Sequence, residues 1–184
     1  MRLATSLFLF TLLLVPAFGA NKTRKTNSVP PSGSTQGRHT DKGRGFSIAL
    51  PSGWQKDKDQ MGTAVMALSN KENANDFFRE NINVVVETLT GSMSTKEYFE
   101  ASQGAIKKVF QDFKLEKTGK EKLNNKEFMW SVYTHKTPTS KAKVLQYVAV
   151  NGLRAYIITC SAAPENFDRY RTLFTSSIKS FKFE

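Results

Sequence analysis

Apolar and polar positions alternate through much of the chain after residue 45. In 45–54, GFSIALPSGW, the alternation stops at Pro51, and Ser52 and Gly53 then turn the chain onto Trp54. An apolar residue at every second position is typical of a strand with one buried face. This run therefore predicts a strand that opens the folded part of the chain.

The same period of two returns in four later segments, 63–69, 81–89, 113–122 and 127–135. Positions predicted to share one face are Ile82, Val84 and Val86 in 81–89, and Phe128, Trp130 and Val132 in 127–135. Asn124 and Asn125 are expected to turn the strand at 113–122 into the one that contains Phe128, since asparagine tolerates the backbone of tight turns.

The clearest local signal is Asn151 followed by Gly152, between β-rich runs at 143–150 and 153–161. Asn-Gly between two such runs is typical of a type I′ hairpin, because both loop residues need a positive φ. A two-residue loop at this position would place Val150 opposite Leu153, Leu145 opposite Ile158 and Tyr147 opposite Tyr156 as a cross-strand aromatic pair.

Two segments have helical spacing. Ser94, Thr95, Lys96 and Glu97 form a capping box, and the apolar stripe expected after it is Tyr98, Ala101, Ala105, Ile106 and Val109. Pro164 is expected to start the second helix, with a buried stripe of Phe167, Tyr170, Phe174, Ile178 and Phe181. Residues 180–183 predict a short closing strand. The predicted fold class is α+β: a mainly antiparallel β-sheet with helices packed on it, as in an αβα sandwich.

The first 44 residues differ in character from the rest. Arg2 and the apolar run 3–18, followed by small residues, are typical of a secretory signal peptide at 1–19; a retained membrane anchor is the alternative. No cysteine lies near the cleavage point, so we expect a secreted or periplasmic protein that is not a lipoprotein. Residues 20–44 are polar and basic and predict a disordered linker, either a spacer or an arm for an anionic surface. The domain would then be 45–184.

Several segments in order resemble the PsbP family. They are GFSIALPSGW (45–54), ENINVVVETL (80–89), SMSTKEYFE (92–100), VNGLRAYIITCSA (150–162) and SFKF (180–183). The family contains the extrinsic subunit of photosystem II and bacterial relatives, and proteins of the same fold include a Ran-binding import factor and chaperones. The resemblance implies an αβα sandwich and a binding or assembly role rather than catalysis. Fold by itself does not determine function.

Residues with reactive side chains do not form a recognisable site in the sequence. A zinc site needs three or four clustered ligands, whereas His39, His135 and the single cysteine, Cys160, lie in different segments. We expect no metal, no cofactor and no catalytic residues, and hence no enzyme; a hydrolase with an unrecognised site is the alternative. Cys160 is expected to be a buried free thiol, with an intermolecular disulfide or redox sensing as alternatives.

Charge is the most suggestive property of the chain, whose formal net charge is +11. The folded part has its basic excess in 113–143, and the lysines there are Lys114, Lys117, Lys120, Lys122, Lys126, Lys136, Lys141 and Lys143. Such a patch attracts anionic partners over long range, or else lysine protects sheet edges against aggregation. No stacking motif supports nucleic acid as the target.

Trp54, Phe77 and Phe78 are the apolar candidates for a contact surface. Phe77 and Phe78 interrupt the polar segment 70–81, and adjacent side chains point in different directions in regular structure. One of them is therefore a candidate partner anchor, and packing over the sheet is the alternative.

Two functions follow from these features. The first is a monomeric, exported binding or assembly module that contacts a protein partner in the cell envelope through Lys114, Lys117, Lys136, Lys141, Lys143, Trp54, Phe77 and Phe78. The second is a carrier or sensor of an amphipathic anionic ligand, such as a lipid, held between sheet and helix.

Overall fold

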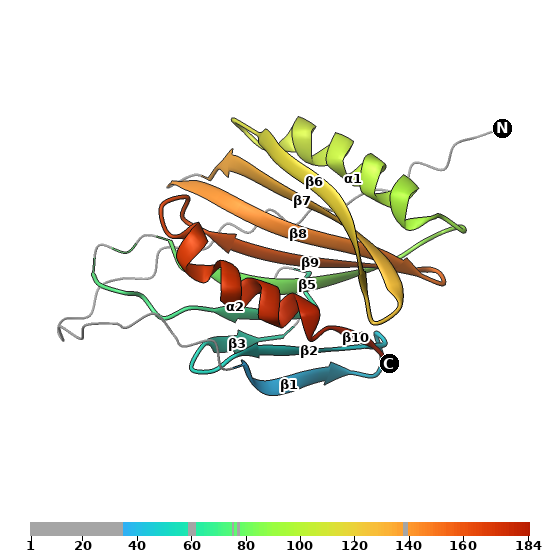
Figure 1. Cartoon of the computed structure of the whole chain (residues 1–184), viewed down its shortest axis with the longest axis horizontal. Coiled ribbons are helices and arrows are strands. Elements are labelled where there is room, and N and C mark those ends of the chain that lie inside the picture. Colours follow the sequence, from blue (N-terminus) through green and yellow to red (C-terminus); the bar gives the residue numbers. More distant parts are fainter. Residues whose placement is uncertain (1–34, 59–61, 75, 77, 138–139) are drawn as a thin grey trace.

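The computed structural model describes residues 35–184 except 59–61, 75, 77 and 138–139 (Figure 1). The predicted signal peptide, 1–19, and the linker residues 20–34 lie outside the described part. In chain order the elements are β1 (Thr35–Asp41), β2 (Phe46–Pro51), β3 (Gln55–Asp57), β4 (Val65–Leu68), β5 (Asn81–Thr88), α1 (Thr95–Val109), β6 (Lys114–Leu123), β7 (Lys126–Lys136), β8 (Lys141–Asn151), β9 (Arg154–Ala162), α2 (Phe167–Lys179) and β10 (Lys182–Phe183).

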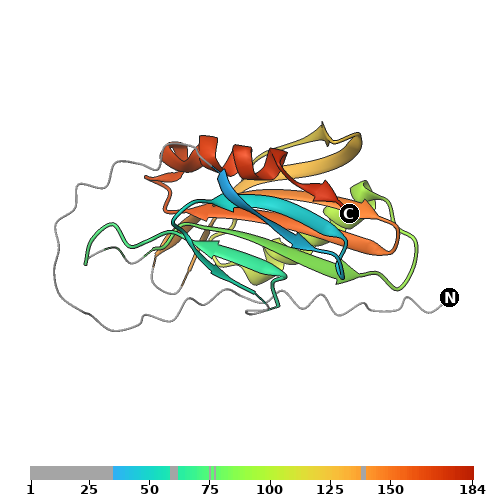
Figure 2. The same ribbon diagram turned by 90° about the horizontal axis from the view of Figure 1, so that it is seen from below.

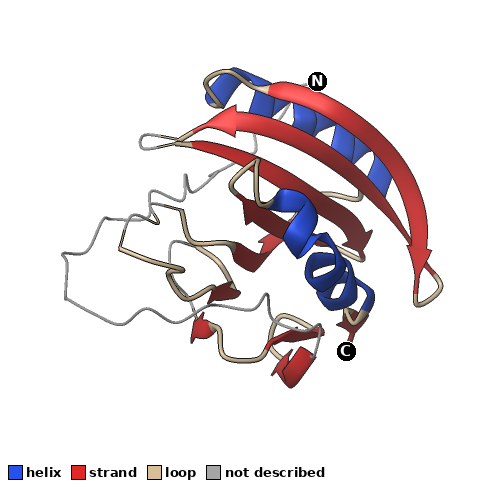
Figure 3. Cartoon of the chain, turned by 60° about the vertical axis from the view of Figure 1, so that its left-hand side comes forward, coloured by secondary structure: helices blue, strands red, loops and turns tan. Residues whose placement is uncertain are grey.

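Two antiparallel sheets and two helices make up the described part of the chain. The large sheet has seven strands in the order β3-β4-β5-β9-β8-β7-β6, and the small sheet has three in the order β1-β2-β10. Figure 3 shows the large sheet curving around α2, with α1 on its outer side, and Figure 2 shows the small sheet and α2 on the same side of the large sheet. The predicted α+β sandwich is therefore confirmed.

The N-terminal boundary predicted at residue 45 is wrong. Thr35–Asp41 forms β1, which pairs with β2 so that Arg38 lies opposite Ala49. The Arg38 guanidinium donates to Ser47 Oγ at 2.9 Å and to the Ser180 carbonyl at 3.0 Å. β1 is held in place by backbone hydrogen bonds to β2 rather than by apolar burial, so it can be polar. Polar composition does not reveal such a backbone ladder.

The face of the large sheet under α2 is one continuous aromatic cluster. The stripe predicted for α2 is buried as expected, and the helix begins at Phe167 rather than at Pro164, after the cap residue Asn166. Phe181 stacks on Phe46 with ring centroids 5.7 Å apart and packs edge-on against Phe128 at 5.8 Å. Adjacent rings at these separations fill the layer between sheet and helix.

The opposite face carries α1, which starts with the predicted capping box. The Ser94 hydroxyl accepts a hydrogen bond from the Glu97 N–H at 3.2 Å, and Glu97 Oε2 accepts one from the Ser94 N–H at 2.8 Å. The predicted stripe is wrong in part, because Ala101 and Val109 are exposed while Phe99 and Ser102 are buried. The buried face of the helix is set by its contact with the sheet, and small or terminal apolar residues specify it weakly.

The hairpin between β8 and β9 has a two-residue loop, but at Gly152 and Leu153 rather than at Asn151 and Gly152. Asn151 pairs with Arg154. Gly152 has a φ of 62° while Leu153 is not in the positive-φ region, the pattern of a type II′ turn. The predicted cross-strand pairs are therefore wrong: the observed pairs are Val150 with Ala155, Tyr147 with Ile158 and Leu145 with Cys160.

The predicted turn at Asn124 and Asn125 is confirmed. Both residues have a positive φ, of 48° and 65°, and the closing pair is Leu123 with Lys126. This is the type I′ geometry expected for the other hairpin. The closing strand is also present, as β10, which pairs with β2 through Phe183 and Phe46.

Candidate protein-binding surface

Five predicted lysines lie on one face at one end of the large sheet, and we call them the lysine corner. Thr134 of β7 is directly opposite Lys114 of β6 on one side and Lys143 of β8 on the other. Lys136, two residues further along β7, lies opposite Lys141. Since side chains alternate between faces along a strand, the members of the lysine corner share the α2 face: Lys114, Lys117, Lys136, Lys141 and Lys143.

A β-bulge is what places Lys114 and Lys117 together. Lys114 lies opposite Thr134 and Lys117 opposite Val132, so three residues of β6 span two of β7, and the register shifts between Leu115 and Lys117. Residues three apart in a regular strand point to opposite faces. The bulge adds the extra residue and turns both ammonium groups to the same side.

Lys143 differs from the other members because it is held by the fold. Its Nζ lies 2.8 Å from Glu116 Oε2 and 5.2 Å from the ring centroid of Phe167, the first residue of α2. The pair is partly buried, so Lys143 connects β8, the bulge of β6 and α2. In contrast, Lys114, Lys117, Lys136 and Lys141 are exposed, and among the described residues none of these four forms an ion pair.

The remaining predicted lysines do not belong to this surface. Lys120 lies opposite Met129, which packs in the cluster under α1, so Lys120 and Lys122 project on the α1 face. Lys120 also pairs with Glu127 at 3.2 Å. Lys126 lies at the other end of the sheet and donates to Asn151 Oδ1 at 3.0 Å.

The apolar contact candidates are not part of an exposed surface in the described structure. Trp54 is only 8 % exposed and packs edge-on against Tyr170, with centroids 6.1 Å apart. Phe78 is half-buried and packs against the cluster of Ile106 and Tyr133. Phe77 lies outside the described residues. Trp54 is therefore a core residue rather than a partner anchor, because its indole completes the layer under α2.

His135 and the thiol of Cys160 lie in separate packing environments. The His135 ring stacks on Phe110 at 4.1 Å, and burial lowers its pKa. Cys160 is fully buried, and burial raises the pKa of its thiol well above the ordinary value. The residue opposite it on β8 is Leu145. A buried neutral thiol reacts slowly. Among the described residues no cluster of potential ligands could hold a metal ion.

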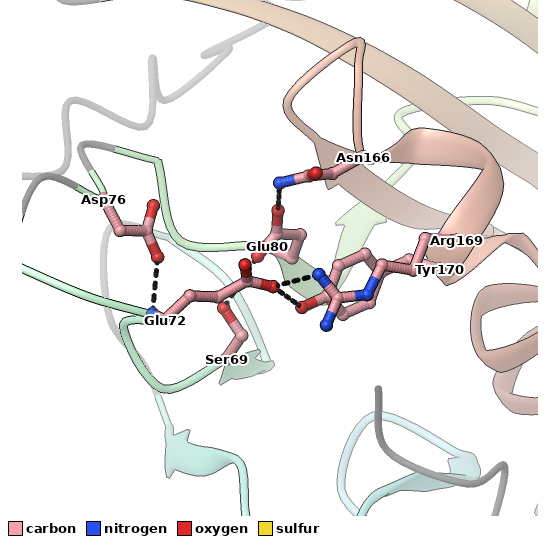
Figure 4. Close-up of polar contacts among 7 residues, drawn as sticks. All are labelled: Ser69, Glu72, Asp76, Glu80, Asn166, Arg169 and Tyr170. Atoms are coloured by element: carbon pink, nitrogen blue, oxygen red, sulfur yellow. Dashed lines mark hydrogen bonds and ion pairs between the residues drawn. The ribbon is translucent and has the colours of Figure 1, made fainter. Parts of the chain in front are cut away.

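A polar network next to the N-terminus of α2 was missed from the sequence (Figure 4). We call it the loop–helix network; its members are Ser69, Glu72, Asp76, Glu80, Asn166, Arg169 and Tyr170. Glu72 Oε1 accepts from the Arg169 guanidinium at 2.7 Å and from the Tyr170 hydroxyl at 3.0 Å. These bonds tie the segment between β4 and β5 to α2. The acidic residues Glu72, Asp76 and Glu80 were the available signal, but their partners come from a distant segment.

Glu80 is the fully buried carboxyl of this network. It accepts hydrogen bonds from Ser69 Oγ at 3.1 Å and from Asn166 Nδ2 at 3.3 Å. Both partners are neutral. Burial raises the pKa of Glu80 above its ordinary value, which these hydrogen bonds only partly offset. The N-terminal end of α2 thus contacts the lysine corner through Phe167, its first residue, and the buried carboxyl through the cap residue Asn166.

Comparison with known proteins agrees with this architecture. The PsbP family profile matches residues 35–183. The solution structure of PsbP from the cyanobacterium Synechocystis is similar, with a TM-score of 0.61 and 14% identity, over 89% of this chain and 98% of that one. LpqN of Mycobacterium tuberculosis, described as involved in cell envelope biogenesis, has a TM-score of 0.62 and 10% identity, over 74% of this chain and 82% of its own.

A yeast protein shares the same fold. The Ran-binding protein Mog1p of Saccharomyces cerevisiae has a TM-score of 0.54 and 8% identity, over 82% of this chain and 96% of that one. A search of curated protein sequences found no match. At these identities the solved structures establish the fold, whereas the family profile covers β1 through β10. The chain belongs to the PsbP family.

Proposed function

We propose that this protein is an exported, non-catalytic binding or assembly module that contacts a protein partner in the cell envelope, and that the lysine corner receives an acidic surface of that partner. The observation that carries the proposal is the convergence of the five lysines on one face, where, among the described residues, only Lys143 forms an ion pair, with Glu116. Uncompensated lysines attract acidic surfaces and accelerate encounter.

Export is part of this proposal and rests on the N-terminal sequence. The apolar run 3–18 and the small residues after it favour a cleaved leader. Among the described residues no helix is long and apolar enough to cross a membrane. The envelope role ascribed to LpqN supports the same compartment, and the Ran-binding activity in the name of Mog1p supports protein binding as a use of this fold.

Packing favours surface binding over the carriage of a lipid inside the fold. An internal ligand would need space between the sheet and α2. In the described structure that layer holds the buried rings of Phe46, Phe128, Phe174 and Phe181. Stacked aromatic rings leave few gaps larger than a water molecule, so the partner contact is assigned to the outer surface.

The test starts from purification of the protein with its partner from the native host. Reversal of Lys114, Lys136 and Lys141 to glutamate should slow association with that partner by about tenfold or more at low salt. The effect should shrink as salt rises, because screening acts over about 8 Å at physiological ionic strength.

A matched control carries the same change of charge elsewhere. Lys42, Lys107 and Lys179 are exposed and lie outside the lysine corner, and their reversal should leave the association rate within about twofold. The proposal fails if the two variants slow association equally, or if the lysine-corner variant keeps a fast, salt-independent rate.

A further inference from the structure

The long outer strand of the large sheet, β6, has an open edge. It is the last strand in the order, and its residues from Lys114 to Lys122 are nearly all exposed. Among the described residues no strand pairs with its outer side, as Figure 1 also shows. Unpaired N–H and C=O groups along such an edge can accept another strand.

Lysines line both faces of this edge, whereas its carboxylates are engaged within the protein. Lys117 projects on the α2 face and Lys122 on the α1 face. Glu116 is paired with Lys143, and Glu121 accepts a hydrogen bond from the Tyr147 hydroxyl at 2.8 Å. A strand added to β6 would therefore meet ammonium groups with the side chains of both its faces.

This charge pattern discriminates between strands that could pair with the edge. Opposite charges on neighbouring strands stabilise a sheet, and like charges directly opposite destabilise it. A second copy of β6 would bring together two edges of the same net positive charge, because Lys114–Leu123 has four lysines against two glutamates. The charge complement is an acidic extended segment, so lysine here protects against self-association while it leaves the edge open to an acidic strand.

Trp130 adds an apolar contact at the middle of the same edge. Gly119 lies directly opposite Trp130, and a Cβ at Gly119 would collide with the indole ring. The half-buried indole therefore lies over the backbone of the edge strand and stacks against Tyr147 with centroids 6.4 Å apart. Partly exposed tryptophan is a frequent energetic centre of protein interfaces.

We propose that β6 receives an extended acidic segment of a protein partner as an additional strand, with one apolar side chain of that segment placed on Trp130 next to Gly119. This inference deepens the proposed function and rests on it, because it specifies how the acidic partner is held. The lysines select a segment with acidic side chains, and the backbone of the edge requires an extended conformation. Trp130 requires an apolar side chain at one position of the segment.

The test uses a synthetic ten-residue peptide in which pairs of glutamates alternate with pairs of valine or threonine, so that carboxylates project on both faces of the strand, and one central valine is replaced by phenylalanine. The readout is hydrogen exchange of the β6 backbone amides, measured by NMR with and without peptide. Strand addition should slow exchange at alternate amides between residues 117 and 123, since every second amide of an edge strand points outward. Charge attraction alone protects none of them.

Three comparisons separate the backbone ladder from the charge. The same peptide with alternate backbone nitrogens methylated keeps its charge but cannot complete the ladder, and it should bind about tenfold more weakly or worse. Reversal of Lys117 and Lys122 to glutamate should weaken the unmodified peptide by about tenfold. Reversal of Lys42 and Lys107 should leave binding nearly unchanged.

The outcomes distinguish this inference from the proposed function. If the peptide binds without protection of β6, or binds equally well when methylated, strand addition is wrong while electrostatic attraction of an acidic partner stands. If the peptide does not bind at all, strand addition is also wrong, and the proposed function is judged by the association rate of the lysine-corner variant. If sedimentation shows that the protein dimerises without peptide, and hydrogen exchange of the β6 amides is slow in that dimer, the occupant of the edge is a second copy and the proposal is overturned.

Discussion

The two faces of the large sheet are built differently. Under α2, rings from strands and helix merge into one cluster. Under α1, two smaller apolar clusters lie apart, one around Tyr98 and Phe99 and the other around Ile106 and Tyr133. Between these clusters a row of polar side chains crosses the sheet, each directly opposite the next on the neighbouring strand: Asn83, Thr159, Gln146, Ser131 and Thr118.

The polar row on the α1 face is only partly satisfied. Gln103 of α1 donates to Ser131 Oγ at 3.1 Å, and Gln146 donates to Thr159 Oγ1 at 3.2 Å. The buried Oε1 of Gln103 has no hydrogen-bond partner among the described residues. Buried polar groups contribute little net free energy even when paired. The α2 face should therefore supply most of the stability, and the α1 face less.

The largest change in the free energy of unfolding should come from replacing a phenylalanine by alanine on each of the two faces. Phe174→Ala removes a fully buried ring from the α2 cluster and should lower the free energy of unfolding by about 3–5 kcal/mol. Phe99→Ala, on α1, should cost about 3 kcal/mol or less, because the smaller cluster can collapse more easily. Urea unfolding of both variants measures the difference, and an equal or larger loss at Phe99 would contradict the comparison.

A smaller effect is expected where the α2 face meets the edge strand. Gly119→Ala places a methyl group against the Trp130 ring and should cost about 1–3 kcal/mol, as overpacking does. Gly104→Ala is the control: Gly104 lies in α1 with open space around it, and the change should stabilise the protein by about 0.5–1 kcal/mol. Thermal unfolding and tryptophan fluorescence report both, and unchanged fluorescence in Gly119→Ala would show that Trp130 does not pack there.

The polar row can be tested by a double-mutant cycle. Ser131→Ala leaves the amide of Gln103 without its partner and should cost about 1–3 kcal/mol. Adding Gln103→Leu removes the other polar group, and the double variant should recover most of that loss, since replacing both partners is nearly neutral. Urea unfolding of the two single variants and the double variant gives the coupling. Strict additivity would mean that this hydrogen bond does not hold α1 to the sheet.

The last effect is a difference in pH dependence rather than in overall stability. Burial raises the pKa of Glu80 in the folded state above its unfolded value, so the fold favours the protonated carboxyl. The stabilisation is complete below the unfolded pKa, which is about 4.3, and is lost as pH rises through the folded pKa. Glu80→Gln should remove this loss and become more stable relative to the wild type as pH rises.

Urea unfolding of wild type and Glu80→Gln between acidic and neutral pH measures that difference directly. Comparing the two proteins cancels the titration of the other carboxyls. Parallel curves would show that the pKa of Glu80 is the same in the folded and unfolded states, and that the loop–helix network does not raise it.

Local patterns in the sequence were sufficient for most elements. Alternation located β2, β5, β6 and β7, the Ser94 capping box located the start of α1, and the aromatic spacing of α2 identified its buried face. These signals are local, because a period of two or of 3.6 and a side-chain cap each depend on a few neighbouring residues. The error in the hairpin loop did not change which residues share a face. A loop displaced by one residue shifts each cross-strand partner by two, and residues two apart in a strand lie on the same face.

Only the tertiary structure decided the hairpin register, the membership of β1 and the lysine corner. A dipeptide such as Asn-Gly fits a type I′ loop, and glycine followed by another residue fits a type II′ loop, so pairing across the whole sheet selects between them. β1 has no apolar pattern, and its place depends on a ladder with β2. Lys114 and Lys117 share a face because of a bulge, and the partners of Glu80 come from the residue after β4 and the turn before α2. Each depends on contacts between distant segments, which local periodicity does not encode.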